Sequence, residues 1–88
     1  MKMKEGLLLR EIAGEYVVIA VGKPELNFNR MLVLNESGAL LFRKLQGGAS
    51  GRELVDALTC EYEVTQEEAV RDVKIFLERL AQAGCMEP

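Results

Sequence analysis

The chain offers few of the side chains that usually carry out catalysis or bind metals. It contains no histidine, which removes the commonest general base and metal ligand. Its two cysteines, Cys60 and Cys85, lie far apart in the sequence, so neither a redox pair nor a zinc site is indicated. We expect both to be small apolar residues in or near the core. The sequence therefore predicts a protein that is not an enzyme and holds no metal and no cofactor.

Two further motifs that could carry chemistry have simpler structural explanations. Gly47-Gly48 precedes a predicted helix, but the surrounding GGASG lacks the lysine and the spacing of a phosphate-binding loop. The adjacent carboxylates Glu67 and Glu68 stand where another helix is predicted to begin, and the helix dipole favours acidic side chains there. We interpret the glycine pair as a turn and the glutamates as part of a helix start.

Size and charge restrict the class of protein further. A chain of 88 residues that is 49% hydrophobic and 28% charged is typical of one small globular domain, here residues 1–88. The net charge of -3 argues against nucleic acid as a partner, because duplex binding depends on Lys and Arg. No apolar run approaches the roughly 20 residues of a membrane span, and none fits a signal peptide. We expect a cytoplasmic protein.

Hydrophobic periodicity divides the chain into a strand half and a helix half. Apolar, β-branched runs bounded by turn residues predict three strands, the first two forming a hairpin, at about 7–12, 16–21 and 30–34. The period then changes from 2 to 3.6, which predicts three helices at about 36–45, 51–61 and 66–83. Segregated strands and helices favour an α+β fold, with a small three-stranded antiparallel sheet followed by three helices in a winged helix-turn-helix-like arrangement.

The starts and ends of the predicted helices carry local signals. Asn35 is a favoured N-cap residue for the first helix. Ser50 and Thr65 are each followed three residues later by a glutamate, which is the pattern of a capping box. Gly84 is a natural C-terminal cap of the third helix. The predicted core face of that helix comprises Ala69, Val70, Val73, Phe76, Leu77 and Leu80.

The second and third strands are apolar at every position instead of alternating with polar residues. One interpretation is that β-propensity alone explains this, with the N-terminal segment or a loop covering the outer face of the sheet. The other is that an exposed strand edge is kept available for a partner. Ile75 is predicted to lie opposite the core face of the third helix, which makes it a candidate contact. Arg71, Lys74 and Arg79 are most simply solvated charges.

From about Glu5 to Glu87 the chain resembles the PqqD-like family, the peptide-binding RiPP recognition elements. Each matching motif is also a cap, a turn or a core position, so the resemblance depends on their order and spacing. The motifs are Leu34-Asn35, Gly38-Ala39, Phe42 where the family often has Trp, Leu45, Gly47-Gly48, Ser50 with Glu53-Leu54, Tyr62, Asp72-Val73, Phe76-Leu77-x-x-Leu80 and Gly84.

The resemblance implies a non-catalytic adaptor. Members of the family bind the leader of a ribosomally synthesised precursor peptide and deliver it to a modifying enzyme, often a radical S-adenosylmethionine (SAM) protein. The leader adds as a fourth strand on the edge of the third strand, in a cleft bordered by the third helix. Periodicity does not say which flank of that helix faces the cleft. The peptide-binding residues implied on this chain are Arg30, Met31, Leu32, Val33, Leu34, Arg71, Lys74, Ile75 and Glu78.

Two alternatives follow from the same features. The winged helix-turn-helix-like arrangement is also that of DNA-binding proteins, although the acidic balance weighs against this function. An unpaired strand edge is in addition a template for a second copy of the chain, which would give a self-associating structural domain and a homodimer.

Overall fold

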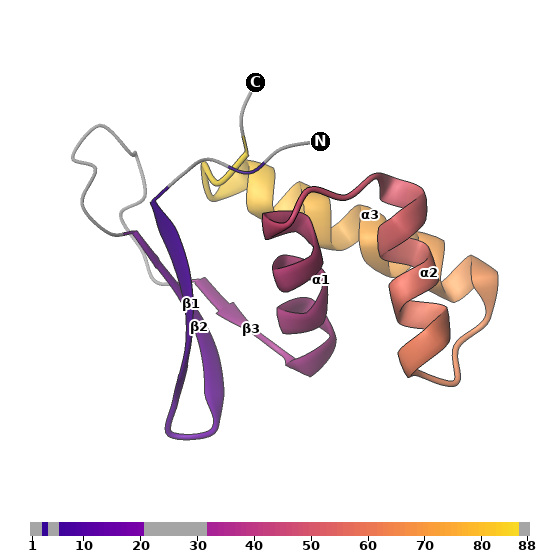
Figure 1. The fold of residues 1–88 in the computed structure, drawn as a ribbon, viewed down its shortest axis with the longest axis horizontal. Coiled ribbons are helices and arrows are strands. Elements are labelled where there is room, and N and C mark those ends of the chain that lie inside the picture. Colours follow the sequence, from indigo (N-terminus) through magenta and orange to yellow (C-terminus); the bar gives the residue numbers. More distant parts are fainter. Residues whose placement is uncertain (1–2, 4–5, 21–31, 87–88) are drawn as a thin grey trace.

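The computed structural model describes Met3, residues 6–20 and residues 32–86, and it confirms the predicted α+β fold. Three strands, β1 (Leu7–Ile12), β2 (Glu15–Ala20) and β3 (Leu32–Leu34), precede three helices, α1 (Glu36–Gln46), α2 (Gly51–Glu61) and α3 (Gln66–Gln82) (Figure 1). The predicted boundaries differ by one residue at the start of β2 and at the ends of α1 and α3. The parts of the predicted strands at Val21 and at residues 30–31 lie outside the described residues.

The described strands form one antiparallel sheet in the order β1-β2-β3. Ala13 and Gly14 connect β1 to β2, and both have positive φ, at 52° and 81°. Two consecutive residues with positive φ are typical of a type I′ turn, whose twist matches that of the flanking strands. β2 is therefore the central strand, and β3 lies at an edge of the sheet.

The two faces of the sheet differ in their environment. Leu7, Val18 and Leu34 point to the helix side and belong to the core. On the opposite face, Val17 is buried, whereas its neighbour Val33 on β3 is 46% exposed. The apolar third strand thus has one side chain in the core and one accessible to solvent. Periodicity alone did not say which side chains of this strand are exposed.

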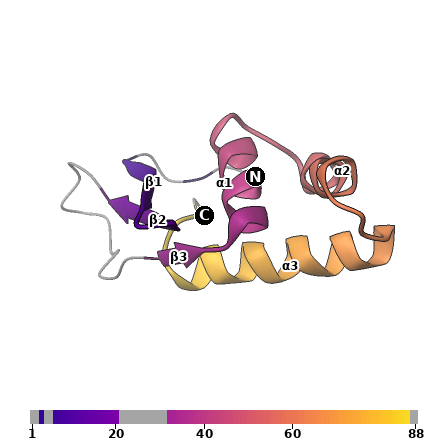
Figure 2. The same cartoon turned by 90° about the horizontal axis from the view of Figure 1, so that it is seen from below.

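The three helices pack against the sheet and against one another. α1 lies between the sheet and α2, while α3 runs along one side of β3, α1 and α2 (Figures 1 and 2). Gln46 Nε2 at the end of α1 donates to the Leu7 carbonyl oxygen at 3.2 Å, and the Arg43 guanidinium stacks over the Tyr16 ring at 5.6 Å. These contacts fix the orientation of α1 on the helix side of the sheet.

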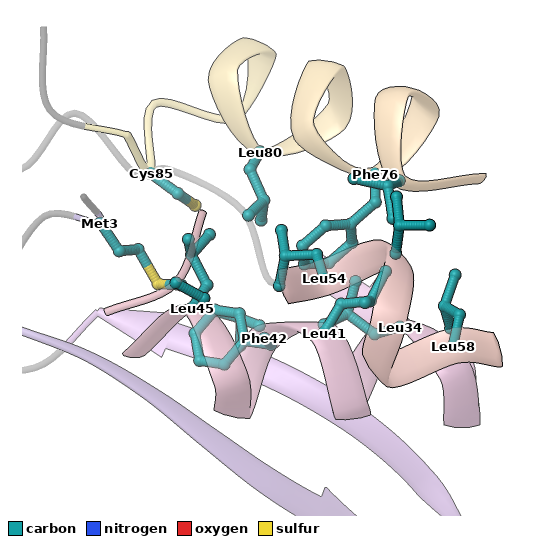
Figure 3. Close-up of a cluster of buried hydrophobic side chains, with 14 of the residues drawn as sticks. Met3, Leu34, Leu41, Phe42, Leu45, Leu54, Leu58, Phe76, Leu80 and Cys85 are labelled. Carbon is teal, nitrogen blue, oxygen red and sulfur yellow. The ribbon is translucent and has the colours of Figure 1, made fainter. Parts of the chain in front are cut away.

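The core is a single apolar cluster to which every helix and every strand contributes (Figure 3). The buried face of α3 comprises Ala69, Val73, Phe76 and Leu80. Val70 was predicted to share this face but is half exposed, because it lies at the boundary of the apolar stripe. Cys85 is buried as predicted. The prediction for Cys60 was wrong, since this residue lies on the exposed side of α2.

The predicted helix caps are all formed. The Asn35 side chain accepts a hydrogen bond from the Gly38 N–H at 2.8 Å, and both capping boxes make their two reciprocal hydrogen bonds. Gly84 follows the end of α3 with a φ of 80°, the left-handed conformation expected of a glycine after a helix. The caps begin each helix at the residue that the sequence predicts.

Loss of the Asn35 cap is expected to destabilise the protein. In Asn35→Ala the Gly38 N–H loses its partner, which costs about 1 kcal/mol of unfolding free energy. Urea denaturation should show a lower midpoint at an unchanged slope. Asn35→Asp keeps an acceptor at the same position and should retain most of the stability. Equal stability of Asn35→Ala and the parent protein would show that the cap contributes nothing.

The capping-box glutamates are expected to link stability to pH. Hydrogen bonds from the Ser50 backbone N–H, and then from the Ser50 side chain, lower the pKa of Glu53 below its ordinary 4.5. The same bonds from Thr65 lower the pKa of Glu68. Since the folded state lowers these pKa values, their contribution is complete above pH 4.5 and is lost as the pH falls through the lowered values.

Replacement of both glutamates by glutamine should therefore reduce the loss of stability on acidification. We expect urea midpoints of Glu53→Gln/Glu68→Gln to fall less between pH 6 and pH 3 than those of the parent protein. Glu67→Gln removes a neighbouring carboxylate that makes no capping hydrogen bond, so it should follow the parent. Parallel pH profiles for all three proteins would contradict this linkage.

Candidate functional site

In the part of the chain that the structure describes, the edge of β3 that faces away from β2 is unpaired. β2 occupies one edge of β3, and within the described residues no strand pairs with the other. α3 lies along this second edge (Figure 2). There the Arg79 Nη2 donates a hydrogen bond to the Val33 carbonyl oxygen at 3.2 Å. The Val33 carbonyl therefore points outward, away from the sheet.

This single bond fixes the direction of the other backbone groups of β3. In an antiparallel ladder the N–H and C=O of one residue point to the same side, and the side alternates from residue to residue. Val33 consequently presents both of its backbone groups to the outer edge. Leu32 and Leu34, which are aligned with Val18 and Tyr16, direct theirs toward β2. The described part of the edge thus offers one outward donor and one outward acceptor, both at Val33.

A groove of about 180 Å³ lies beside this edge, between the β3–α1 connection and α3. Its apolar part comes from side chains that also belong to the core, among them Leu34, Leu41 and Phe76. Figure 3 shows these three side chains facing one another across the space between α1 and α3. The complete lining consists of Leu34, Asn35, Ser37, Gly38, Leu41, Leu58, Asp72, Ile75, Phe76 and Arg79.

The wall of the groove formed by the β3–α1 connection depends on a close backbone approach at Gly38. A Cβ at this position would lie 3.0 Å from Asn35 Oδ1 and 3.3 Å from Leu34 Cβ. Either contact is tighter than a side chain normally tolerates, so a larger residue would move the capping oxygen or Leu34. Glycine therefore allows the strand to pass into the helix directly, with Leu34 at the groove and Asn35 at the cap.

The α3 wall of the groove carries a negative charge at one end and a positive charge at the other. Asp72, Ile75 and Arg79 are spaced by three and four residues, which places them along one face of the helix. Ile75 is 50% exposed, so an apolar surface lies between the two charges. The face of α3 that borders the groove is therefore apolar at its centre and charged at both ends.

A second hollow of about 280 Å³ continues the groove past Asp72 toward α2. It is lined by Glu36 and Tyr62, among other residues. Burial raises the pKa of the Tyr62 hydroxyl, and the negative charges of Glu36 and Glu61 raise it further. This end of the groove accordingly has a negative potential.

The structure brings some of the residues expected at the site together and leaves others apart. Leu34 and Ile75 line the groove, and Val33 provides the outward edge. Leu32 is half-buried and belongs to the same strand. Arg71, Lys74 and Glu78 are exposed on α3 and are not among the residues that line the groove. Arg30 and Met31 lie outside the described residues.

Three residues on α3 border the groove but were not among the expected site residues, namely Asp72, Phe76 and Arg79. Arg79 had been interpreted as a solvated charge and Phe76 as a core residue alone. Their spacing from Ile75 is the signal that could have indicated them, since positions 72, 75, 76 and 79 share one helical face. Sequence periodicity did not say that this face borders β3.

Two classes of feature are not found in the described residues. No group of three or more His, Cys, Asp or Glu side chains there is arranged to hold a metal ion. None of the described helices is long and apolar enough to cross a bilayer.

A three-stranded sheet followed by three helices, with an open strand edge beside a groove, defines a winged domain suited to binding an extended chain. The sequence matches the model of the PqqD family, described as coenzyme PQQ synthesis protein D, over residues 15–86. The protein belongs to this family. No curated protein matches the chain.

Two solved structures are similar to this protein over nearly their whole length. One is described as "TbiB1 in Complex with the TbiA(beta) Leader Peptide"; it has a TM-score of 0.76 and 27% identity, covering 97% of this chain and 94% of that one. The other is described as "Lasso peptide synthetase B1 complexed with the leader peptide"; it has a TM-score of 0.78 and 23% identity, covering 99% of this chain and 96% of that one. At 23% identity, the similarity to the second structure is evidence for the fold alone.

The outward direction of the Val33 carbonyl can be tested without any ligand. Arg79→Met keeps an apolar stem but removes the donor, so the Val33 carbonyl carbon and the Leu34 amide nitrogen should change chemical shift. Because the bond is exposed, the unfolding free energy should fall by no more than about 1 kcal/mol. Arg71→Met, an exposed residue two turns earlier on α3, should leave both signals in place. Unchanged signals in Arg79→Met would mean that this bond is absent in solution.

Proposed function

We propose that this protein is a non-catalytic adaptor that binds the leader of a ribosomally synthesised precursor peptide and delivers it to a modifying enzyme, such as a radical SAM protein. The observation that carries the proposal is the outward edge of Val33 beside the groove between β3 and α3. An extended peptide placed on this edge becomes a fourth strand of the sheet. Main-chain hydrogen bonds then provide affinity and the groove provides side-chain selectivity.

The geometry of β3 suits strand addition for two reasons. The N–H and C=O of Val33 both point to the open edge, so an added strand gains a pair of hydrogen bonds there. Leu34 points to the helix side of the sheet, and the groove that it lines lies on this same side. Side chains of the added strand on that same side therefore enter the groove, while the alternate side chains remain near Val33.

Similarity supports the same assignment. The structural neighbour at 27% identity was solved in complex with a leader peptide, and this protein belongs to the PqqD family. The proposal needs no catalytic group in the adaptor. The chemistry would reside in the partner enzyme, and the adaptor would raise the local concentration of the precursor at that enzyme.

Self-association would use the same edge in this scheme. A second copy that paired through β3 would occupy the outward groups of Val33, so it would compete with the peptide. A homodimer of this kind would dissociate when the leader binds.

Proline substitutions on β3 provide a sharp test, because proline removes one backbone N–H. The Val33 N–H points outward, so Val33→Pro should remain folded but bind the leader more weakly by at least about 1–2 kcal/mol. The Leu32 N–H points toward β2, so Leu32→Pro should instead lower the melting temperature. Melting curves and titrations with a candidate leader peptide measure both effects.

Val33→Ala serves as the matched control, since it truncates the side chain and keeps the backbone donor. It should bind the leader more tightly than Val33→Pro does. In amide NMR spectra of the parent protein, the leader should perturb residues 32–34 and α3 most. A folded Val33→Pro variant with parental affinity would exclude strand addition at this edge.

A further inference from the structure

The groove beside β3 has a charged side chain at each of its ends that could pair with an opposite charge on a ligand. Within the described residues, the Asp72 side chain makes no hydrogen bond and no ion pair, and the Arg79 side chain makes only its bond to the Val33 carbonyl. Both side chains line the groove, with Ile75 and Phe76 between them. An occupant that matched this pattern would gain contacts at both ends and in the middle.

We propose that the groove selects peptide strands carrying a basic, an apolar and an acidic side chain, in that order from the N-terminus, at positions i, i+2 and i+4. The basic side chain pairs with Asp72, the apolar one enters the groove against Phe76, and the acidic one pairs with Arg79. This assignment depends on the proposed function and names the class of peptide that the site takes.

We place the added strand antiparallel to β3, as β2 is on its other edge, and its direction along the groove then follows from the course of the two elements that border it. β3 runs toward α1, whereas α3 runs the opposite way beside it, so the C-terminal half of α3 lies next to β3 (Figure 2). Arg79 contacts Val33, and Asp72 lines both hollows together with Asn35 and Ser37. A strand antiparallel to β3 therefore enters at Asp72 and leaves at Arg79.

The spacing follows from the rise of a helix and of a strand. Asp72 and Arg79 are separated by seven residues of α3, which is about 10 Å along the helix axis. Positions i and i+4 of a strand lie on one face and are about 13 Å apart. Long charged side chains span the remaining difference of about 3 Å, while position i+2 stands at the centre of the groove. Positions i and i+2, about 7 Å apart, differ from the helix spacing by a similar amount, but they leave no side chain between them to fill the apolar centre of the groove.

Arg79 has a different partner before and after the peptide binds. In the free protein its guanidinium donates a hydrogen bond to the Val33 carbonyl oxygen. An added strand would use this same oxygen as the acceptor for one of its backbone N–H groups. Displacement leaves the guanidinium at the end of the groove with its five N–H donors available. A carboxylate is the acceptor that matches this fork, because two parallel hydrogen bonds can form.

The opposite end of the groove favours a cation. Glu36 lines the hollow that continues past Asp72, and neither carboxylate is paired within the described residues. The negative charge of Glu36 also contributes to the raised pKa of Tyr62 in the same hollow. A lysine or arginine of the peptide would therefore meet two carboxylates there, whereas an acidic side chain would be repelled.

Selection from a displayed library of random 12-residue peptides tests the proposal. On the parent protein we expect enrichment of the pattern Lys/Arg, apolar, Asp/Glu at alternate positions. Arg79→Glu should replace the acidic preference by a basic one, and Asp72→Lys should replace the basic preference by an acidic one. Arg52→Glu and Asp56→Lys make the same charge changes on exposed positions of α2 outside both hollows, so they should enrich the parental pattern.

A binding cycle then measures the contact at Arg79. An enriched peptide is compared with its Glu→Gln counterpart on the parent protein and on Arg79→Met. We expect the Gln peptide to bind the parent about 2- to 5-fold more weakly, the scale of a solvent-accessible ion pair. On Arg79→Met the two peptides should bind equally. Since both peptides must displace Arg79 from Val33, this cost cancels in the comparison.

Two results would overturn the assignment, and they differ from a failure of the proposed function. Peptides enriched on the parent without the charge pattern would overturn it, and so would an acidic preference that persists on Arg79→Glu. If the parent enriches no peptide while the β3 edge is intact by NMR, the proposed function itself fails and the assignment fails with it.

Discussion

The passage from β3 to α1 through the single residue Asn35 is the constraint on which the rest of the structure depends. The Asn35 side chain accepts the Gly38 N–H, so the helix begins immediately after the strand. The missing side chain at Gly38 lets this connection close tightly against Leu34. Because Leu34 is fixed in the core, the neighbouring Val33 is held with its backbone groups directed outward. Core packing and the open edge are thus consequences of one local turn.

Much of the fold could be predicted from the sequence, because its signals are local. Asn35, the two capping boxes and Gly84 each determine the end of a helix through contacts within a few residues. The change of period from 2 to 3.6 separates the sheet from the helices for the same reason. Val70 was misplaced because exposure at the boundary of an apolar stripe depends on which element packs there. Cys60 was misplaced because its residue type was given more weight than its position, which is on the exposed side of α2.

The site could be predicted only in part, since it lies between elements far apart in the sequence. The family resemblance indicated β3 and α3, but periodicity could not say which flank of α3 borders the strand. The Arg79–Val33 bond joins residues 46 positions apart, and only the tertiary structure contains that information. The same bond identifies which residue of β3 faces outward. Register of this kind is a property of paired strands and cannot be read from one of them.

An exposed strand edge that serves as a binding site is also a liability, because it is a template for aggregation. Natural proteins protect such edges with short strands and charged side chains. Among the described residues β3 comprises only three, and Arg79 covers the outward carbonyl of Val33. A single exposed hydrogen bond is worth little enough to be exchanged for those of a peptide strand. Under the proposed strand addition, the interaction that protects the edge in the free protein must be weak, since a buried or bidentate partner at Val33 would close the proposed site to the peptide.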